Sequence, residues 1–179
     1  MARVVHTLHR AGLRAGRAAV AALAATAVIG VAGAVAPESV APTAGVAAAA
    51  PAPRAVGKTI GYNTGMPGQC TWGAMNQFRA YSGRYAALAG NAKDWYRNAR
   101  ATGWSTSLSP QPNSMVVFQP GVQGASPYGH VGWVDRVVRT RNGVAVHIWD
   151  MNGPGGPFST RWWWTTNTPG MSYILAPPR

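Results

Sequence analysis

Hydrophobic positions divide this chain into three parts with different patterns. Residues 18–36 form a run of nineteen positions without a charged side chain, and residues 37–57 are rich in Ala and Pro with no repeating pattern. From residue 58 onward, apolar positions recur at helical or strand spacing between turns rich in Gly and Pro. Because a chain of this length ordinarily holds one domain, we expect a single folded domain over residues 58–179.

A helix is predicted over residues 70–82. The turn-forming pair Pro67-Gly68 precedes it, and Gly83 is a natural C-terminal stop. Apolar side chains recur along the segment at helical spacing: Ala74, Phe78 and Tyr81. Cys70 therefore lies in the first turn of the predicted helix.

Two later segments predict a β-hairpin. Residues 130–138 and residues 144–152 are both rich in β-branched side chains and show an alternating pattern of apolar and polar positions. Asn142-Gly143 lies between the two segments. Asn-Gly between two such runs is the strongest short-range hairpin signal. We therefore expect the two segments to pair as antiparallel strands.

Side-chain alternation along these strands selects candidate partners for His130. Neighbouring side chains point to opposite faces of a strand, so Asp150 and Asn152 share one face of the second strand. We expect that face to contain His130 as well. By the same alternation, Asp135 and His147 point to the other face, as polar residues on the exposed side of the sheet, and would need a bulge to join the first group.

The N-terminal region has the three parts of a secretory signal. Four arginines and no acidic residue occupy residues 1–17, an apolar stretch follows, and small residues end it. The stretch is mostly Ala and Gly, which makes it weakly apolar for a permanent membrane helix. We expect an export signal over residues 1–36, with cleavage between residues 36 and 50, and a flexible linker over residues 37–57. The product would be secreted or held at the cell wall, and membrane-bound only if the signal stays uncleaved.

The chain is strongly basic, with a formal net charge of +12 and 16 Lys and Arg residues against 4 acidic ones. Such a surface attracts polyanions, among them nucleic acids, anionic lipids and acidic wall polymers. The basic residues are scattered and match no nucleic-acid-binding motif, so we expect no nucleic-acid partner. Anionic wall polymers remain as expected partners.

Cys70 is the one cysteine in the sequence, so the chain has no internal disulfide. A lone thiol in an exported protein is either buried and inert or reactive and used. A helix start favours the second alternative, because its free N–H groups and the helix dipole stabilise a thiolate. The same N–H groups, with the Gln69 amide, are suited to hold an oxyanion.

His130 is the candidate general base. The sequence has four histidines, of which His6 and His9 lie in the predicted signal, leaving His130 and His147. Strand alternation favours His130, with either Asp150 or Asn152 orienting its ring. The residues alone leave the choice between Asp150 and Asn152 open.

The segment Gly68-Gln-Cys-Thr-Trp72 resembles the nucleophile motif of the CHAP domain, a cysteine- and histidine-dependent amidohydrolase/peptidase of the papain-like superfamily. Four further segments, in the family's order, are similar to its other motifs: 91–95, 112–121, 129–131 and 148–152. The resemblance covers nearly all of residues 62–177. Asp150 stands where the family usually has glutamate. Gly73 stands where an aromatic residue is common, and we expect that difference to be a surface detail.

This resemblance implies an α+β papain-like fold, with two or three N-terminal helices packed on an antiparallel sheet of about five strands. It implies a cysteine hydrolase that cuts amide bonds of bacterial peptidoglycan, as an amidase or an endopeptidase. Asp150 would then orient His130, with Asn152 close by. Some relatives bind calcium through an acidic loop near the nucleophile, and no acidic residue lies between Glu38 and Asp94 here. We therefore expect no metal and no cofactor, and a monomer.

The eight tryptophans are a high number for one small domain. Trp72 and Trp133 flank the candidate catalytic segments, so we expect them to wall the substrate groove. Residues 162–164 are three consecutive tryptophans and cannot all face inward, so we expect Trp162 and Trp163 to contact substrate. The alternative is a β-edge that wraps the core.

Two other functions fit the same residues. The fold could be a non-catalytic module that binds wall glycans, or a basic exported toxin that acts on another amide. Loss of wall hydrolysis in a Cys70→Ser variant distinguishes the enzyme from the binding module.

Overall fold

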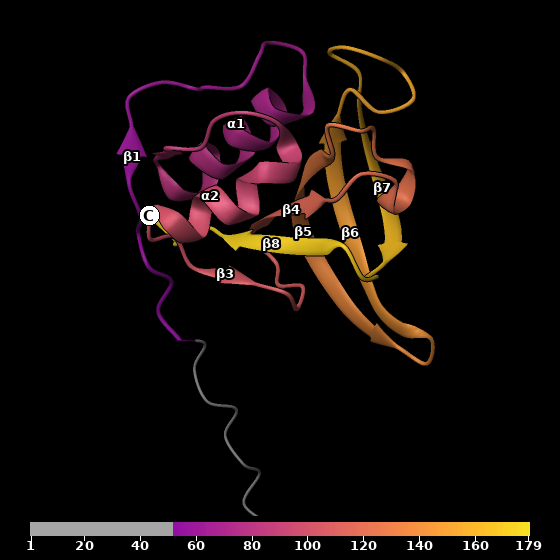
Figure 1. Ribbon diagram of the computed structural model, residues 1–179. Helices are drawn as coiled ribbons and strands as arrows, with labels where there is room; N and C mark the ends of the chain where they lie inside the picture. The colour runs from indigo at the N-terminus through magenta and orange to yellow at the C-terminus, as the bar shows by residue number, and fades with distance from the viewer. Residues whose placement is uncertain (1–51) are drawn as a thin grey trace, which may run out of the picture. The chain divides into compact units, whose positions relative to one another are not determined.

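The computed structural model describes residues 52–179. The predicted export signal and most of the predicted linker lie outside this range. The helices and strands follow one another in the chain as labelled in Figure 1. Their bounds are β1 (Thr59–Ile60), α1 (Cys70–Ser82), β2 (Tyr85–Ala86), α2 (Trp95–Ala101), β3 (Thr106–Ser107), β4 (Ser114–Phe118), β5 (His130–Thr140), β6 (Gly143–Met151), β7 (Thr160–Thr166) and β8 (Met171–Leu175), with short 3-10 turns at Ala92–Asp94 and Val122–Gly124.

The main sheet has six strands in the order β3-β8-β4-β5-β6-β7, and every neighbouring pair is antiparallel. It is one strand larger than expected, because the last strand, β8, inserts between β3 and β4 and brings the two-residue β3 with it. β1 and β2 form a separate small sheet. The predicted α+β class with helices before an antiparallel sheet is confirmed.

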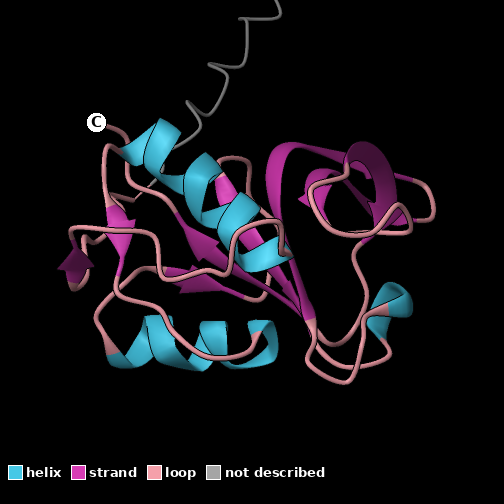
Figure 2. Ribbon diagram, turned by 90° about the horizontal axis from the view of Figure 1, so that it is seen from above, coloured by secondary structure: helices cyan, strands magenta, loops and turns pink. Residues whose placement is uncertain are grey.

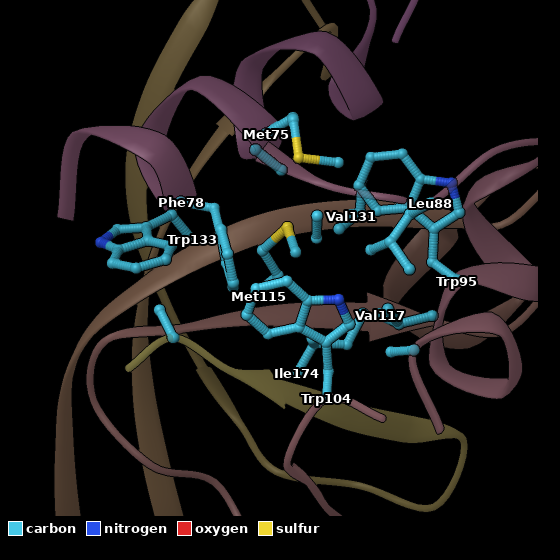
Figure 3. Close-up of a cluster of buried hydrophobic side chains, with 14 of the residues drawn as sticks. Met75, Phe78, Leu88, Trp95, Trp104, Met115, Val117, Val131, Trp133 and Ile174 are labelled. Atoms are coloured by element: carbon cyan, nitrogen blue, oxygen red, sulfur yellow. The ribbon is translucent and has the colours of Figure 1, made fainter. Parts of the chain in front are cut away.

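Both α-helices cover the same face of the sheet (Figure 2). On that face, side chains of α1 and α2 meet those of β4, β5 and β8. Figure 3 shows Phe78 and Trp104 beside Met115, and Trp95 beside Leu88. A second apolar cluster lies on the opposite face, around Val116, Ile148 and Tyr173. The paired ends of β5 and β6 extend beyond the helices (Figure 1).

Helix α1 has the predicted bounds, and local sequence explains both ends. Gln69 is the N-cap residue with extended backbone angles, and Gly83 at the C-terminal end has φ of 75° and donates its N–H to the Arg79 carbonyl. Only Gly takes that left-handed conformation at little energetic cost. The predicted apolar positions Ala74 and Phe78 are fully buried.

Gly73 is buried against the sheet, which corrects the expectation that it is a surface detail. A Cβ atom at this position would lie 2.8 Å from Cβ of Met151 and 3.0 Å from the Trp149 ring. Glycine therefore lets α1 approach β6 closely. Because Cys70 is one turn away on the same helix, this close approach helps to set the distance between Cys70 and the strand that carries Asp150.

The predicted hairpin is confirmed, with Arg141-Asn142 as its two-residue loop between β5 and β6. The register aligns Gly132 with Asp150 and Val134 with Ile148. A bulge between Val134 and Arg136 then shifts the pairing, so that Arg136 lies opposite His147. The bulge falls at Asp135.

Arg54, which lies in the predicted linker, contacts the domain that follows. The Arg54 guanidinium donates hydrogen bonds to the carbonyls of Asn113 and Ala176, at 2.6 and 2.8 Å. The end of the predicted linker is therefore part of the domain, because an arginine there can satisfy two carbonyls at the end of the sheet. No helix between residues 52 and 179 is long and apolar enough to cross a membrane.

Candidate active site

A cavity of about 850 Å³ opens where the N-terminus of α1 meets the start of β5. Cys70 and His130 both line it, together with Gln69 and Asn152. These residues are up to 83 positions apart in the sequence. The packing of α1 on the β5–β6 hairpin therefore assembles this group.

Cys70 is the first residue of α1 and is partly exposed. No side chain caps the helix start, since the side chain of Gln69 forms no capping hydrogen bond. The first N–H groups of a helix have no partner within the helix. The uncapped first turn can therefore stabilise negative charge beside the Cys70 sulfur.

His130 lies between Cys70 and Asp150. Its Nε2 atom is 3.0 Å from Oδ2 of Asp150, and both His130 and Cys70 line the cavity. Since Nε2 faces Asp150, Nδ1 is the ring nitrogen left for the sulfur. Burial disfavours the charged ring, but the hydrogen bond to Asp150 and the influence of the nearby Cys70 outweigh it and raise the pKa of His130 to about 9. At neutral pH the ring is therefore an imidazolium.

Asp150 is 1% exposed and is held by residues of β7. Arg161 donates to both carboxylate oxygens, at 3.0 and 3.1 Å, and the Trp163 indole N–H donates to Oδ2 at 3.0 Å. Burial alone would raise the pKa of Asp150, but the hydrogen bonds from His130 and Arg161 lower it. The carboxylate therefore stays charged beneath the imidazolium.

Arg161 and Trp163 have roles that the sequence analysis did not identify. The register of β6 and β7 places Arg161 directly opposite Asp150. Alternation along β7 then puts Trp163 on the same face. A second hairpin after residue 152 was the feature of the sequence that could have identified them. The connecting loop, residues 152–159, is too long for its turn residues to fix the register between β6 and β7.

Asn152 contacts Gln69 instead of His130. Its Nδ2 atom donates to Oε1 of Gln69 at 2.5 Å. Of the two candidate orienting residues, Asp150 is therefore the one whose side chain touches the His130 ring. Because Asn152 donates to the Gln69 oxygen, the N–H groups of the Gln69 amide remain available to hydrogen-bond a group in the cavity.

The four candidate substrate-binding tryptophans lie in different places. Trp163 lines the cavity, as expected of a substrate contact. Trp133 is 6% exposed and packs in the helix-facing core beside Phe78, so the expectation that it walls the groove is wrong. Trp72 is outside the cavity lining and packs edge-on against Phe158, with 6.4 Å between ring centroids.

Trp162 also lies away from the cavity, because neighbouring residues of β7 face opposite sides of the sheet. Trp163 points to the cavity side, so Trp162 and Trp164 point to the other side, where they are 52% and 48% exposed. The expectation that Trp162 contacts substrate in the groove is therefore wrong. Strand alternation explains the difference.

Arg161 and the His130 imidazolium are the charged side chains that line this cavity, and both are positive. Asp150 lies behind them and is not part of the lining. Among residues 52–179, no group of three or more His, Cys, Asp or Glu side chains could hold a metal ion. The arrangement joins a cysteine side chain at an uncapped helix start to a histidine ring fixed by a buried carboxylate, which suits nucleophilic attack on a carbonyl followed by proton transfer.

The sequence matches the family model of the CHAP domain over residues 61–152. It is 32% identical over 93 residues to the probable autolysin SsaALP of Staphylococcus aureus, covering 51% of this chain and 32% of that protein. It is also 32% identical over 101 residues to staphylococcal secretory antigen ssaA2 of the same species, covering 56% and 34%. The chain thus spans about a third of the length of these relatives.

A solved structure, that of an N-acetylmuramoyl-L-alanine amidase from Staphylococcus aureus, resembles this fold with a TM-score of 0.53 and 27% sequence identity. The similarity covers 61% of this chain and 30% of the amidase.

Proposed function

This chain belongs to the CHAP domain family, and from that premise we propose that it hydrolyses an amide bond of bacterial peptidoglycan through a thioester on Cys70. The observation that carries the proposal is that Cys70 and His130 line one cavity, while His130 is hydrogen-bonded to the buried Asp150. The similarity to an autolysin and to an amidase of the muramoyl–L-alanine bond supports peptidoglycan as the substrate.

In the first half of the reaction, the Cys70 thiolate attacks the amide carbonyl carbon and a C–S bond forms. The His130 imidazolium gives its proton to the amide nitrogen, and the C–N bond breaks to release the amine. In the second half, water attacks the thioester carbonyl and His130 takes its proton. The C–S bond then breaks, the acid product leaves, and the thiolate–imidazolium pair is restored.

We propose that the N–H groups at the start of α1 and the Gln69 amide stabilise the oxyanion that forms in both steps. Asn152 holds Gln69 by its oxygen, so the amide N–H groups are the part left to face the substrate. Arg161 keeps Asp150 charged and fixed, which holds the His130 ring in position. Fixed donors need no reorganisation as charge develops in the transition state.

The bond cut is either the one between muramic acid and L-alanine or one within the peptide stem and cross-bridge. The likeness to an N-acetylmuramoyl-L-alanine amidase supports the first. We further propose that residues 1–36 direct export and that the domain acts, as a monomer, outside the cell or at the wall. The name of one relative, a secretory antigen, supports that location.

The test is digestion of purified peptidoglycan by the wild type and by Cys70→Ser, with mass analysis of the released fragments. We expect the wild type to release fragments with new amino termini and Cys70→Ser to release none. A free L-alanine amino terminus identifies the amidase. Equal release by both proteins would reject the cysteine mechanism, and wall binding without release by the wild type would support the non-catalytic alternative.

A further inference from the structure

The sheet carries a second group of aromatic and charged side chains on the face opposite Trp163. We name it the outer aromatic cluster, and its members are Asp135, Arg136, His147, Trp162 and Trp164. None of them lines the catalytic cavity. The mechanism proposed above uses none of them.

The cluster is held in a fixed arrangement. The His147 ring lies between the two indoles, with its centroid 4.9 Å from that of Trp162 and 4.7 Å from that of Trp164. Nδ1 of His147 is 2.7 Å from Oδ1 of Asp135, and the β5 bulge places Arg136 opposite His147. The Arg136 guanidinium lies 5.9 Å from the centre of the Trp164 ring.

Core packing does not account for Trp162 and Trp164. The inward position of β7, Trp163, already packs against the second apolar cluster. The outward positions of an antiparallel strand with one solvated face are normally polar. Here two indoles occupy them, each about half exposed, and Val138 adds a further exposed apolar side chain to this face. Exposed apolar groups gathered in this way mark binding surfaces.

The net charge of the domain and the exposed Arg136 favour an anionic partner. Residues 57–179 contain eleven Lys and Arg but three acidic residues. All three acids are paired: Asp94 with Arg97, Asp135 with His147, and Asp150 with His130 and Arg161. Arg136, a member of the cluster, lies 3.9 Å from Asp135 and has its side chain 64% exposed. A negatively charged polymer therefore meets attraction and little repulsion here.

We propose that the outer aromatic cluster is a second binding site, for the glycan strand of peptidoglycan. The C–H faces of sugar rings stack on the fixed indoles, and the carboxylates of the stem peptides are drawn to Arg136. The identity of the glycan rests on the proposed function. Binding on this face keeps the enzyme on an insoluble wall between cleavage events and raises the local substrate concentration at the catalytic cavity.

Soluble and insoluble substrates should depend differently on the outer aromatic cluster. A soluble muropeptide needs only the catalytic cavity, because the cluster faces the other side of the sheet. An insoluble wall uses both sites. Loss of the cluster should therefore weaken attachment to the wall and leave hydrolysis of the soluble fragment unchanged.

The experiment uses the full chain with Trp162→Ala and Trp164→Ala together. In a Cys70→Ala background, co-sedimentation with purified peptidoglycan, stripped of accessory anionic polymers, should show binding weakened roughly tenfold or more. The matched control is Tyr62→Ala, an aromatic residue that is 64% exposed and outside the cavity lining, which should bind as the parent does. With Cys70 intact, the double variant should hydrolyse a soluble muropeptide at the wild-type kcat/KM, which also verifies its folding.

Three outcomes would overturn the proposal: undiminished binding to stripped peptidoglycan, equal loss of soluble and insoluble hydrolysis, or a loss of binding confined to walls that retain accessory polymers. A change in oligomeric state on ultracentrifugation would instead assign the face to self-association and overturn it as well. Failure of the wild type to cut peptidoglycan would reject the proposed function. That result is distinguishable, because binding is measured in the Cys70→Ala protein.

Discussion

The Nε2 atom of His130 lies 3.0 Å from Oδ2 of Asp150, a carboxylate that is almost completely buried. The same oxygen also accepts hydrogen bonds from Arg161 and Trp163. A buried carboxylate with these donors keeps its charge, and that charge keeps the proton on His130. The first predictions follow from this chain of contacts.

Asp150→Asn should lower the pH at which activity is lost on the alkaline side, here called the alkaline limit. The pKa of His130 is raised to about 9, so the imidazolium that protonates the leaving amine is present at neutral pH and is lost as pH rises through about 9. Without the carboxylate, that loss should occur at lower pH, and kcat should fall roughly 10²- to 10⁴-fold. The pH dependence of kcat/KM on a soluble muropeptide measures both effects.

The matched control is Asp135→Asn, which removes the carboxylate partner of His147 on the other face of the sheet. Its alkaline limit should equal that of the wild type. An unchanged limit in Asp150→Asn, or the same displacement in both variants, would contradict the assigned role of Asp150.

Arg161→Met should destabilise the fold by about 1–3 kcal/mol at pH 7, a discounted value because the Arg161 side chain is 40% exposed. The pKa of Asp150 is lowered in the folded state, so its stabilising pairs are present above the unfolded value and are lost as pH falls. The destabilisation should therefore shrink in acid. Urea unfolding at pH 7 and pH 3.5 (a value chosen near the ordinary Asp pKa of about 3.9) measures it.

Arg97→Met is the control for Arg161→Met, because Arg97 pairs with Asp94 with its side chain 78% exposed. That change should stay within about 0.5 kcal/mol of the wild type at both pH values. Equal effects of the two substitutions would mean that Arg161 acts only as an ordinary surface residue.

Gln69→Ala and Asn152→Ala should act as one unit. Loss of an oxyanion donor lowers kcat by about 10²- to 10³-fold, and Asn152→Ala should give a smaller loss, since it frees Gln69 to rotate. The double variant should resemble Gln69→Ala alone. Because Asn152 does not contact His130, the alkaline limit should stay near the wild-type value in all three proteins. Additive losses in kcat would show that Asn152 acts independently of Gln69.

Gly73→Ala should lower the free energy of unfolding by about 1–3 kcal/mol, because the added methyl group overlaps Met151 and Trp149. Gly61→Ala is the matched control, since a Cβ atom there meets nothing within 4 Å. Denaturant unfolding of both variants tests the comparison. Equal stability of the two would mean that α1 can move away from β6 without loss.

Local sequence determined the helix that begins at Cys70 and the hairpin that carries His130 and Asp150. Helical spacing, a Gly stop and an Asn-Gly turn are properties of adjacent residues, so each element could be predicted without knowledge of the rest of the fold. Strand alternation went one step further and placed His130 and Asp150 on one face, which the register of β5 and β6 confirms.

Tertiary structure alone decided the contacts between distant segments. Asn152 meets Gln69 because α1 packs beside the end of β6, and Arg161 reaches Asp150 because a long loop sets the register of β7. The same packing buries Trp133 under α1. Such contacts depend on strand order, loop length and the approach of helix to sheet, which no periodicity within one segment encodes.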